Sequence, residues 1–439
     1  MRIASLRRGV HPPEHKDTCT SPIKYILPAK GATMVFPMVQ HIGAPCEPAV
    51  KKGDTVLVGE KIADSGAFMS SPITSTVSGT VTDIRDAVTP SGRIYPAVVI
   101  ENDGELREHP SLNRVIDYKE LSREEKLAHI RECGIVGLGG AGFPTQIKLN
   151  PPPEKKIDTV FINAAECEPY LTNDHRVLLE ESDRILLGLD VILSMFPDAR
   201  GIVAIENNKP DAIEKLTKMN TSPRVSVMAM KTKYPQGAEK QIIQACLGRE
   251  VPSGGFPMDV GCIVQNVDTT IAVHRAFFRG RPLMRKVITI AGGAVANPGN
   301  YKVRLGMSYR DVIEIIGGLK SEPFKIVMGG PMMGVAHYTL DVPVIKTSSA
   351  LLLFTAKEGK HLEERSCFRC GKCVEHCPMG LMPLELNKYA IHNNIERFND
   401  FNGMDCIECA CCSYICPAKR HLAQSISTVR RGLMSKRGA

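Results

Sequence analysis

The chain has 439 residues, of which 43% are hydrophobic and 23% are charged, and its formal net charge is +8. This length provides for three or four domains, and the composition excludes a globally disordered chain. No apolar run approaches the ~18–20 residues of a membrane-spanning helix. A global positive charge is weak evidence for any class of partner, and no nucleic-acid partner is expected.

The fifteen cysteines indicate in which kind of cellular compartment the protein is found. Arg7 and Arg8 are followed by "GVHPPEHKD" and not by an apolar segment, so no export signal is expected. Cysteine-rich chains without such a signal belong to reducing compartments, where metal binding is more common than disulfide formation. The sequence therefore predicts a cytoplasmic, metal-binding protein.

Residues 1–30 are interpreted as an N-terminal arm, and residues 31–110 as the first folded module. The segments "PCEPAVKKGDTVLVGEKIADS" and "SSPITSTVSGTVTDI" are similar to the barrel-sandwich fold of biotinyl and lipoyl carriers. A carrier needs a modifiable lysine at its hairpin tip, and the corresponding stretch "GAFMSSPITS" has none. We therefore expect an unmodified structural module, because no prosthetic group is attached to it.

A glycine-rich loop, "GIVGLGGAGFPTQIKL", follows, in which Gly137, Gly139 and Gly142 satisfy G-x-G-x-x-G. The segment before it, "SREEKLAHIREC", is predicted to be a helix, whereas the ordinary dinucleotide fingerprint needs a strand there. Bare backbone amides can still close on phosphates or on a flat ring, and Lys148 can add a positive charge. A flexible turn is the alternative for the loop taken alone.

Three buried strands are predicted beyond the loop, in "IDTVFINAA", "GIVAIEN" and "RVSVMAM", with helical segments at 173–196 and 210–219 between them. This alternation predicts a parallel α/β sheet, which binds ligands at the carboxyl ends of its strands. Polar residues follow the strands at positions where a cofactor would lie: Asn163, Glu166, Glu168, Gly237, Glu239, Asn266 and Asp268. Each acid taken singly can instead be a solvated charge or a helix cap, and Asp268 can cap "TTIAVHRAFF".

Four ordered motifs, "GLGGAGFPTQIKL", "NAAECEPYLTNDHR", "YPQGAEKQ" and "VQNVDTT", resemble the NADH-binding flavin subunit of respiratory complex I. The resemblance implies that residues 115–285 form an FMN- and NADH-binding domain. Cofactor contacts are implied for Gly137, Gly139, Gly140, Phe143, Lys148, Asn163, Glu166, Glu168, Glu239, Asn266, Val267 and Asp268. Two positions depart from that family, because Leu138 stands where it has Arg and Ala165 where it has Asp.

Residues 286–345 predict a strand, a turn rich in Gly, Pro and Asn, a second strand, and a helix that starts near Ser308. This segment resembles the small β-grasp module of SLBB type that also follows the flavin domain in complex I. We expect it to join the flavin domain to the cysteine-rich region.

Two runs, Cys367 to Pro378 and Cys406 to Pro417, each fit C-x2-C-x2-C-x3-C-P. In two-cluster ferredoxins three cysteines of such a run bind one [4Fe–4S] cluster and the fourth binds the other. One ligand set is therefore predicted to be Cys367, Cys370, Cys373 and Cys416, and the other Cys406, Cys409, Cys412 and Cys377. Zinc is the alternative, but zinc sites have no use for the third cysteine of each run.

Cys411 is an extra cysteine between two ligands and is interpreted as a packed thiol. Cys19, Cys46, Cys133, Cys246 and Cys262 have no partner spacing and are expected to be buried thiols. Helical spacing between and after the runs predicts a helical two-cluster domain over 350–425.

A basic tail is predicted over residues 426–439. From residue 418 to the end there are six Lys or Arg residues and no acid. The tail is expected either to be solvated or to dock on acidic lipid or an acidic protein.

The order of modules, together with "GVHPPEHK", resembles the C subunits of the Rnf complex, the ion-translocating ferredoxin:NAD oxidoreductase, over essentially the whole chain. The resemblance implies a peripheral subunit on the cytoplasmic side of the cell membrane, which passes electrons between NAD(H), FMN and two [4Fe–4S] clusters. Its partners would be the membrane-embedded and peripheral Rnf subunits, with ferredoxin acting through another subunit and the ions pumped elsewhere.

Three alternatives remain open at this point. A cobalamin reductase carries a similar loop and similar clusters, although its flavin segment comes first. A soluble NADH oxidoreductase and a non-enzymatic iron–sulfur scaffold are the others. No residue is expected to act as a general acid or base.

Overall fold

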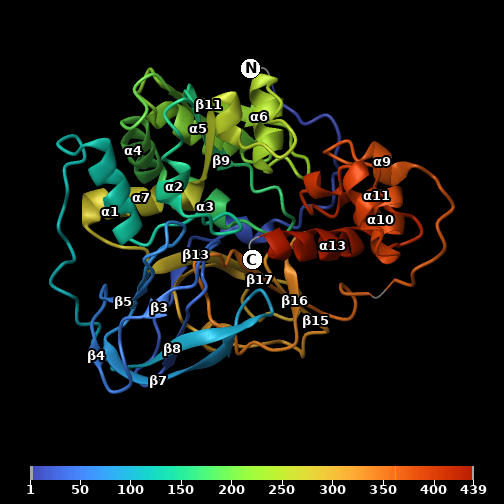
Figure 1. Cartoon of the computed structure of the whole chain (residues 1–439). Coiled ribbons are helices and arrows are strands. Elements are labelled where there is room, and N and C mark those ends of the chain that lie inside the picture. Colours follow the sequence, from blue (N-terminus) through green and yellow to red (C-terminus); the bar gives the residue numbers. More distant parts are fainter. Residues whose placement is uncertain (1–2, 361, 438–439) are drawn as a thin grey trace.

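The computed structural model describes residues 3–360 and 362–437, and the side chains of Cys19 and Arg437 lie outside this description. Four modules are visible in Figure 1: a helix-rich α/β domain at the top, two β-rich modules below it, and a small helical domain at the side. An N-terminal arm with a short 3-10 helix, Asp17–Thr20, precedes them. The predicted multidomain α/β fold is confirmed.

The barrel-sandwich module contains two antiparallel sheets, with strand orders β2-β8-β7-β4 and β3-β5-β6. Its strands are β2 (Thr33–Pro37), β3 (Glu47–Pro48), β4 (Thr55–Val56), β5 (Lys61–Asp64), β6 (Ile73–Thr74), β7 (Gly79–Val88) and β8 (Ile94–Asn102). Met34 and Phe36 of β2 are almost completely buried on either side of the half-buried Val35, whereas residues 97–100 of β8 are all buried. The alternation in β2 shows which face of that strand points inward.

The flavin-type domain has a four-stranded parallel sheet in the order β11-β10-β9-β12. These strands are β9 (Thr159–Ala164), β10 (Arg200–Glu206), β11 (Val225–Met230) and β12 (Cys262–Asn266). Its helices are α1 (Arg123–Glu132), α2 (Thr145–Lys148), α3 (Asn173–Glu180), α4 (Ser182–Leu193), α5 (Pro210–Met219), α6 (Glu239–Leu247), the 3-10 turn Pro257–Val260 and α7 (Val267–Arg279). As predicted, a helix precedes the glycine loop: α1 begins at a capping box between Ser122 and Glu125.

The β-grasp module is a six-stranded sheet in the order β1-β14-β13-β17-β15-β16. Its elements are β1 (Lys24–Tyr25), β13 (Arg285–Ala291), β14 (Gly299–Arg304), α8 (Tyr309–Ile315), β15 (Lys325–Met328), β16 (Val335–His337) and β17 (Ala350–Phe354). The N-terminal arm supplies β1, and β17 pairs with both β13 and β15. The sequence-based boundary at residue 350 therefore lies before a strand of this sheet, whose five residues are fully buried or nearly so.

The cysteine-rich domain is helical, as predicted. It contains α9 (Lys372–Glu375), α10 (Pro383–Ile391), α11 (Ile395–Asp400), the 3-10 turn Gly403–Asp405, α12 (Cys411–Ile415) and α13 (Leu422–Arg437). A long irregular connection after β17 leads into it and swings away from the rest of the molecule in Figure 1.

Residues 426–437, which were predicted as a separate basic tail, form the second part of α13 and pack in the cysteine-rich domain. Ile426 is 1% exposed, and Val429 and Leu433 pack in the same apolar cluster. Spacings of three and four residues place these side chains on one helix face, and their burial holds the helix on α10. Residues 438–439 lie outside the described chain.

One continuous apolar cluster runs through the barrel-sandwich, flavin-type and β-grasp modules. It includes Phe36 and Val98, Val160 and Ile271, and Ile288. The cysteine-rich domain has separate small clusters of its own. Three modules thus share one core, whereas the fourth is joined to them through a narrower contact.

In the described part of the chain, every helix is too short or too polar to cross a membrane.

Candidate flavin and iron–sulfur sites

The glycine loop is held at several points by three different modules. Its Leu138 amide donates to Thr269 Oγ1 of α7 at 2.8 Å. Its Leu138 carbonyl accepts from Lys286 Nζ of β13 at 2.8 Å. The Gly142 carbonyl accepts from the Ile42 amide of the barrel-sandwich module at 3.2 Å. The middle of the loop is left open by these contacts.

The exposed centre of the loop has unpaired donors. Gly139 and Gly140 are exposed, and neither their amides nor that of Ala141 donates a hydrogen bond to any described residue. A Cβ added at Gly140 would meet nothing within 4 Å. Free amides with space in front of them suit a phosphate or a flat ring.

Gly139 is needed because Asn266 lies against it. A Cβ at Gly139 would come within 2.8 Å of Asn266 Nδ2. Asn266 is at the end of β12, where it caps α7 by accepting from the Asp268 amide at 2.9 Å. The cap is therefore Asn266 and not Asp268, and the loop and the carboxyl end of β12 meet at this point.

Asp268 and Val267 are buried beneath the loop. Asp268 is 4% exposed, and its carboxylate accepts from Lys286 Nζ at 2.8 Å. Because Lys286 also donates to the loop carbonyl, one buried ion pair connects the β-grasp sheet, α7 and the glycine loop. Removing either charge would leave the other uncompensated in the interior.

Two further pairs of the predicted residues come together. Lys148 at the end of α2 forms an ion pair with Glu239 at 2.9 Å, at the first residue of α6. Asn163 at the end of β9 donates to the Gly237 carbonyl at 2.7 Å. The first contact joins α2, and the second joins the end of β9, to the segment "YPQGAEKQ". Segments that line a ligand site are expected to meet in this way at one edge of a parallel sheet.

Glu166 and Glu168 have partners of a different kind. Glu166 accepts from the amides of Asp174 and His175 at 2.6 and 3.2 Å and so caps α3. Glu168 accepts from the amides of Met332 and Met333 in the β-grasp module at 3.0 and 2.9 Å. Burial raises the pKa of Glu168 to about 7, and these amides counteract the shift.

An unpredicted acid, Asp174, completes the network behind Asn266. Its carboxylate accepts from Asn266 Nδ2 at 2.8 Å. Burial, followed by the nearby Glu166, raises the pKa of Asp174 to about 7. The capping residue of α7 is thus held by a buried carboxyl group whose surroundings disfavour its charged form.

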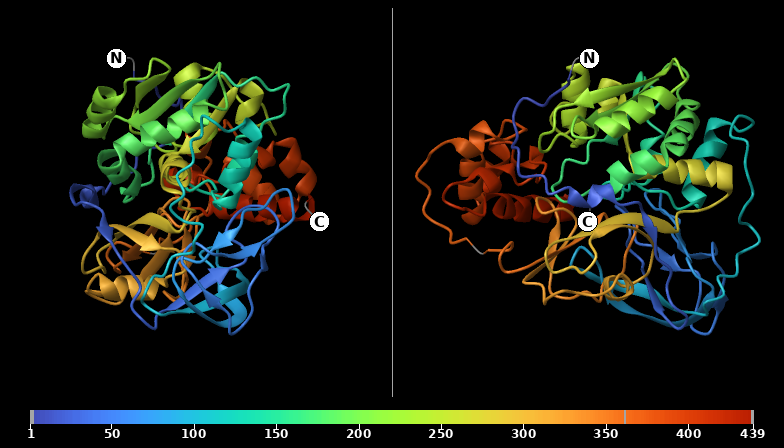
Figure 2. Two further views of the ribbon diagram at one scale, coloured as in Figure 1. Left: turned by 90° about the vertical axis from the view of Figure 1, so that its left-hand side faces the viewer. Right: turned by 180° about the vertical axis from the view of Figure 1, so that it is seen from behind.

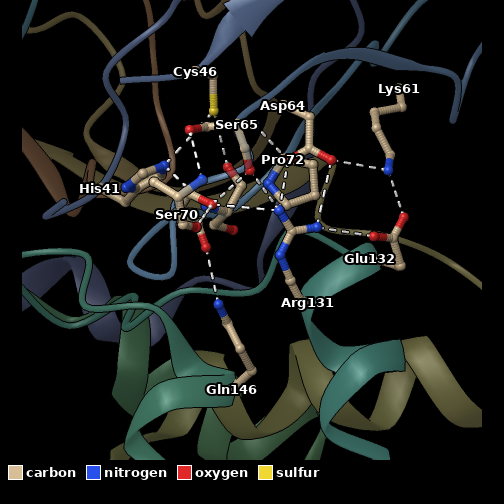
Figure 3. Close-up of polar contacts among 12 residues, drawn as sticks. His41, Cys46, Lys61, Asp64, Ser65, Ser70, Pro72, Arg131, Glu132 and Gln146 are labelled. Carbon is tan, nitrogen blue, oxygen red and sulfur yellow. Dashed lines mark hydrogen bonds and ion pairs between the residues drawn. The ribbon is translucent and has the colours of Figure 1, made fainter. Parts of the chain in front are cut away.

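The barrel-sandwich hairpin tip is fixed to the flavin-type domain, as Figure 3 shows. Arg131 at the end of α1 donates to Asp64 Oδ1 at 2.9 Å and to the Ser65 carbonyl at 2.8 Å. Gln146 of α2 donates to the Ser70 carbonyl at 2.9 Å. The tip that would carry a modified lysine in a carrier is immobilised here, which fits the predicted structural role.

Lys346 lies at the junction of three modules. It is 1% exposed and donates to the carbonyls of Pro72 at 2.6 Å and Gly134 at 2.7 Å. Burial lowers the pKa of Lys346 to about 7, and Cys46 and Asp64 counteract the shift. Lys346 thus fixes the start of the glycine loop to the hairpin tip.

One predicted ligand set surrounds a common pocket. Cys377, Cys406, Cys409 and Cys412 line one small pocket, together with Cys411. Burial first, and then the neighbouring Cys409, Cys406 and Cys377, raise the pKa of the Cys412 thiol. Iron offsets this cost because it binds and stabilises thiolates. The four donors suit one [4Fe–4S] cluster.

The other predicted set is closer to the surface. Cys373 and Cys416 are 9% and 8% exposed and share one apolar cluster, whereas Cys367 and Cys370 are exposed. Among the described residues, no group of three or more His, Cys, Asp or Glu side chains is arranged for a single metal ion.

Cys411 is completely buried, as expected for a packed thiol, with its Sγ atom 3.8 Å from the Tyr234 carbonyl. Cys46, Cys133 and Cys262 are buried as predicted, whereas Cys246 is only half-buried. The side chain of Cys19 lies outside the described part.

Four family models match successive parts of the chain. They are the RnfC barrel sandwich hybrid domain over residues 4–105, the Nuo51 FMN-binding domain over 130–275, the SLBB domain over 287–336 and the 4Fe-4S dicluster domain over 360–417. The predicted order of modules is therefore confirmed.

Relatives match over the whole length. The C subunit of the proton-translocating ferredoxin:NAD(+) oxidoreductase complex of Clostridium ljungdahlii is 46% identical, covering 97% of this chain and 93% of that protein. The C subunit of the Na(+)-translocating complex of Acetobacterium woodii is 41% identical, covering 100% of this chain and 99% of that protein. The chain belongs to the RnfC family.

Membership of the RnfC family rests on sequence and not on the fold comparison. An NAD+-reducing [NiFe]-hydrogenase structure covers 72% of this chain and 62% of its own, with 17% identity and a TM-score of 0.48. That likeness carries no argument. The full-length RnfC relatives favour the Rnf interpretation over the cobalamin reductase alternative.

The RnfC-type site also depends on residues that sequence reasoning missed. Thr269, Lys286, Lys346 and Arg131 hold the loop and the hairpin tip, and Asp174 holds Asn266. Asp174 lies within the motif "NAAECEPYLTNDHR". Lys286 and Lys346 are more than a hundred residues away in sequence from the loop residues that they hold, so no local pattern indicated them.

We predict that Lys346→Met removes a pH-dependent part of the stability. Because the folded protein holds this proton less tightly than the unfolded chain, stability should rise with pH from about 7 toward the ordinary lysine pKa of ~10.4. The free energy of unfolding of the wild type, measured by urea unfolding, should therefore rise relative to that of the variant between pH 7 and pH 9. The exposed Lys52→Met is the control, and equal pH dependence in all three proteins would contradict the assignment.

We predict that Cys377→Ala destroys the cluster bound by the second cysteine run. Iron content should fall by about half, and the residual EPR spectrum of the reduced protein should match that of Cys409→Ala. Cys370→Ala should give the complementary spectrum. A Cys377→Ala spectrum that matches Cys370→Ala would overturn the ligand division.

Proposed function

We propose that this chain is the peripheral electron-transfer subunit of an ion-translocating ferredoxin:NAD(+) oxidoreductase, which passes electrons between NAD(H), FMN and two [4Fe–4S] clusters. The observation that carries the proposal is the coexistence, in one RnfC-family chain, of an FMN-binding domain and a dicluster domain. Its partners are the other subunits of that complex.

When bound, FMN exchanges a hydride with NAD(H) and single electrons with the clusters, which are one-electron carriers. Each NADH oxidised thus delivers two electrons and leaves NAD+ and a proton. This chain supplies the positions of these groups and the environment that tunes them.

The residues proposed to hold FMN are those that meet at the sheet edge. The free amides of Gly139, Gly140 and Ala141 face a phosphate or the ring, and Asn266 closes on Gly139. Lys148 and Glu239 form the far side as an ion pair. Glu168 is proposed to support the FMN site without contacting FMN, because both its carboxylate oxygens accept hydrogen bonds from the β-grasp module.

We propose an order of electron transfer from the different burial of the two ligand sets. The pocket of Cys377, Cys406, Cys409 and Cys412 adjoins the flavin-type domain, where Cys411 contacts Tyr234. Cys367 and Cys370 are exposed on the other set. We assign the pocket cluster to exchange with FMN and the exposed cluster to exchange with a partner subunit, beside the exposed Phe368.

The chain is proposed to sit on the cytoplasmic side of the cell membrane, bound to the membrane-embedded subunits. Ion translocation is assigned to those subunits. Ferredoxin is proposed to reach this chain through another subunit.

Anaerobic NADH titration of the holoprotein tests the proposal. The purified chain should contain flavin and iron in a ratio of about one to eight. NADH should bleach the flavin and then the clusters, followed by absorbance and EPR. Flavin-free protein whose clusters stay oxidised with NADH would favour a scaffold role.

We predict that Gly139→Ala weakens FMN binding at least tenfold, which corresponds to ~1.4 kcal/mol. The added methyl group would lie within 2.8–3.0 Å of the Asn266 side chain and displace it. Gly432→Ala, which meets nothing within 4 Å, is the control. FMN dissociation constants from fluorescence titration provide the measurement, and equal values in both variants would contradict the assigned site.

A further inference from the structure

The cysteine-rich domain meets the rest of the molecule through a small apolar contact. Its buried members are Val10 of the arm, Tyr234 of the flavin-type domain, and Cys409 and Cys411 of the cysteine-rich domain. Three of the four modules share one core, but this domain does not. The separation between the flavin site and the pocket cluster is therefore set by few interactions.

The N-terminal arm runs through that contact. Figure 2 (right) shows it descending between the flavin-type and cysteine-rich domains. Gly9 donates its amide to the His376 carbonyl at 3.1 Å, and Arg8 Nη1 donates to the Val374 carbonyl at 3.3 Å. Among the described residues, the Gly9 bond is the one backbone-to-backbone hydrogen bond between segment 362–437 and the rest of the chain.

The flavin-type domain adds contacts to this junction from Gln241 and from the loop of Ser253 and Gly254, whose amide donates to Asp405 at 3.4 Å. Gln241 of α6 donates to the Pro378 carbonyl at 3.3 Å, and the exposed Ser253 donates to Asp405 at 2.5 Å. These contacts depend on side chains that can change rotamer, whereas the Gly9 bond fixes backbone to backbone. The arm therefore provides the stiffest connection between the two domains.

The next arm residue is fixed to the flavin side. The amides of Val10 and Tyr234 each donate to the other's carbonyl at 2.8 Å. Tyr234 begins the motif that carries Gly237 and Glu239, and His376 directly precedes Cys377. Two adjacent arm residues, Gly9 and Val10, therefore connect the residue before a proposed cluster ligand to the loop of the flavin site.

The arm is held firmly on both sides of this point. Upstream, Ala4 pairs with the edge of β11, donating to the Ala229 carbonyl at 3.1 Å. Downstream, Lys16 Nζ donates to the carbonyls of Glu166 and Glu168 at 2.9 and 3.0 Å. The arm is thus part of the flavin-type domain, and its bond to His376 ties the cysteine-rich domain to that domain.

Gly9 is the residue that allows this geometry. Its φ is +92°, and a Cβ there would lie 2.3 Å from the Tyr234 carbonyl oxygen. Any side chain would force the arm away from Tyr234 or from His376.

We propose that Gly9 is a positioning residue that sets the separation of the pocket cluster from the flavin site and thereby the rate of electron exchange between them. This inference rests on the proposed function. The rate of electron exchange falls steeply as the separation of two redox centres grows, and a domain held by few contacts is sensitive to a change in that separation.

The test compares Gly9→Ala with Gly53→Ala in the full-length protein loaded with FMN and clusters. Gly53 has nearly the same φ, +94°, but a Cβ there meets nothing within 4 Å. The control therefore carries the same backbone strain without the collision. Stopped-flow absorbance measures flavin reduction by NADH and the later cluster reduction separately.

Gly9→Ala should keep its flavin and iron and its rate of flavin reduction, while cluster reduction slows severalfold. Hydrogen exchange of the amides near Tyr234 and in segment 374–379 should increase. Gly53→Ala should change none of these. Cluster reduction as fast as in Gly53→Ala, or equal slowing of both steps, would overturn the inference.

A second variant keeps the test decisive if Gly9→Ala does not retain its cofactors. Val10→Ala removes apolar contact at the same junction, where Val10 is 4% exposed, without strain. It should slow cluster reduction selectively but less. Absence of flavin reduction by NADH in the wild type would instead refute the proposed function and not this role of Gly9.

Discussion

The structure depends on keeping one loop open. Amides that bind a phosphate or a ring cannot be paired within the protein, so the loop must be held at other positions. Lys346 holds Gly134, Thr269 and Lys286 hold Leu138, and Ile42 holds Gly142. These partners come from all three modules that share the main core. The unpaired centre is stable because its flanks are bonded, for the most part by the buried side chains of Thr269, Lys286 and Lys346.

This constraint explains why modules without redox chemistry are retained beside the flavin-type domain. The barrel-sandwich hairpin tip lacks a carrier lysine and is bonded by Arg131 and Gln146. The β-grasp sheet contributes Lys286, which satisfies a loop carbonyl and the carboxylate of Asp268 together. Buried lysines are tolerated here because backbone carbonyls or a carboxylate replace the water they lose.

The cysteine-rich domain follows a different principle. Its packing is local, and α13 completes it while Arg430 and Arg431 pair with Glu408 between two proposed ligands. A domain with its own small core needs little from its neighbours to fold, but electron transfer requires it to be placed accurately. The contact of Gly9, Val10 and Tyr234 is proposed to meet that requirement through few residues.

The sequence by itself determined the modules and their order, because these depend on local periodicity, and fixed spacings within short runs predicted the cysteine ligands. It also located Gly139, Asn163 and Asn266, since residues after parallel strands converge at one edge. It did not reveal Lys286, Lys346 or Arg131, and it assigned residues 426–437 and the strand 350–354 to other modules than the structure does. Only the tertiary structure decided these, because a buried charge is specified by partners distant in the chain and a basic helix is fixed by the apolar face it buries.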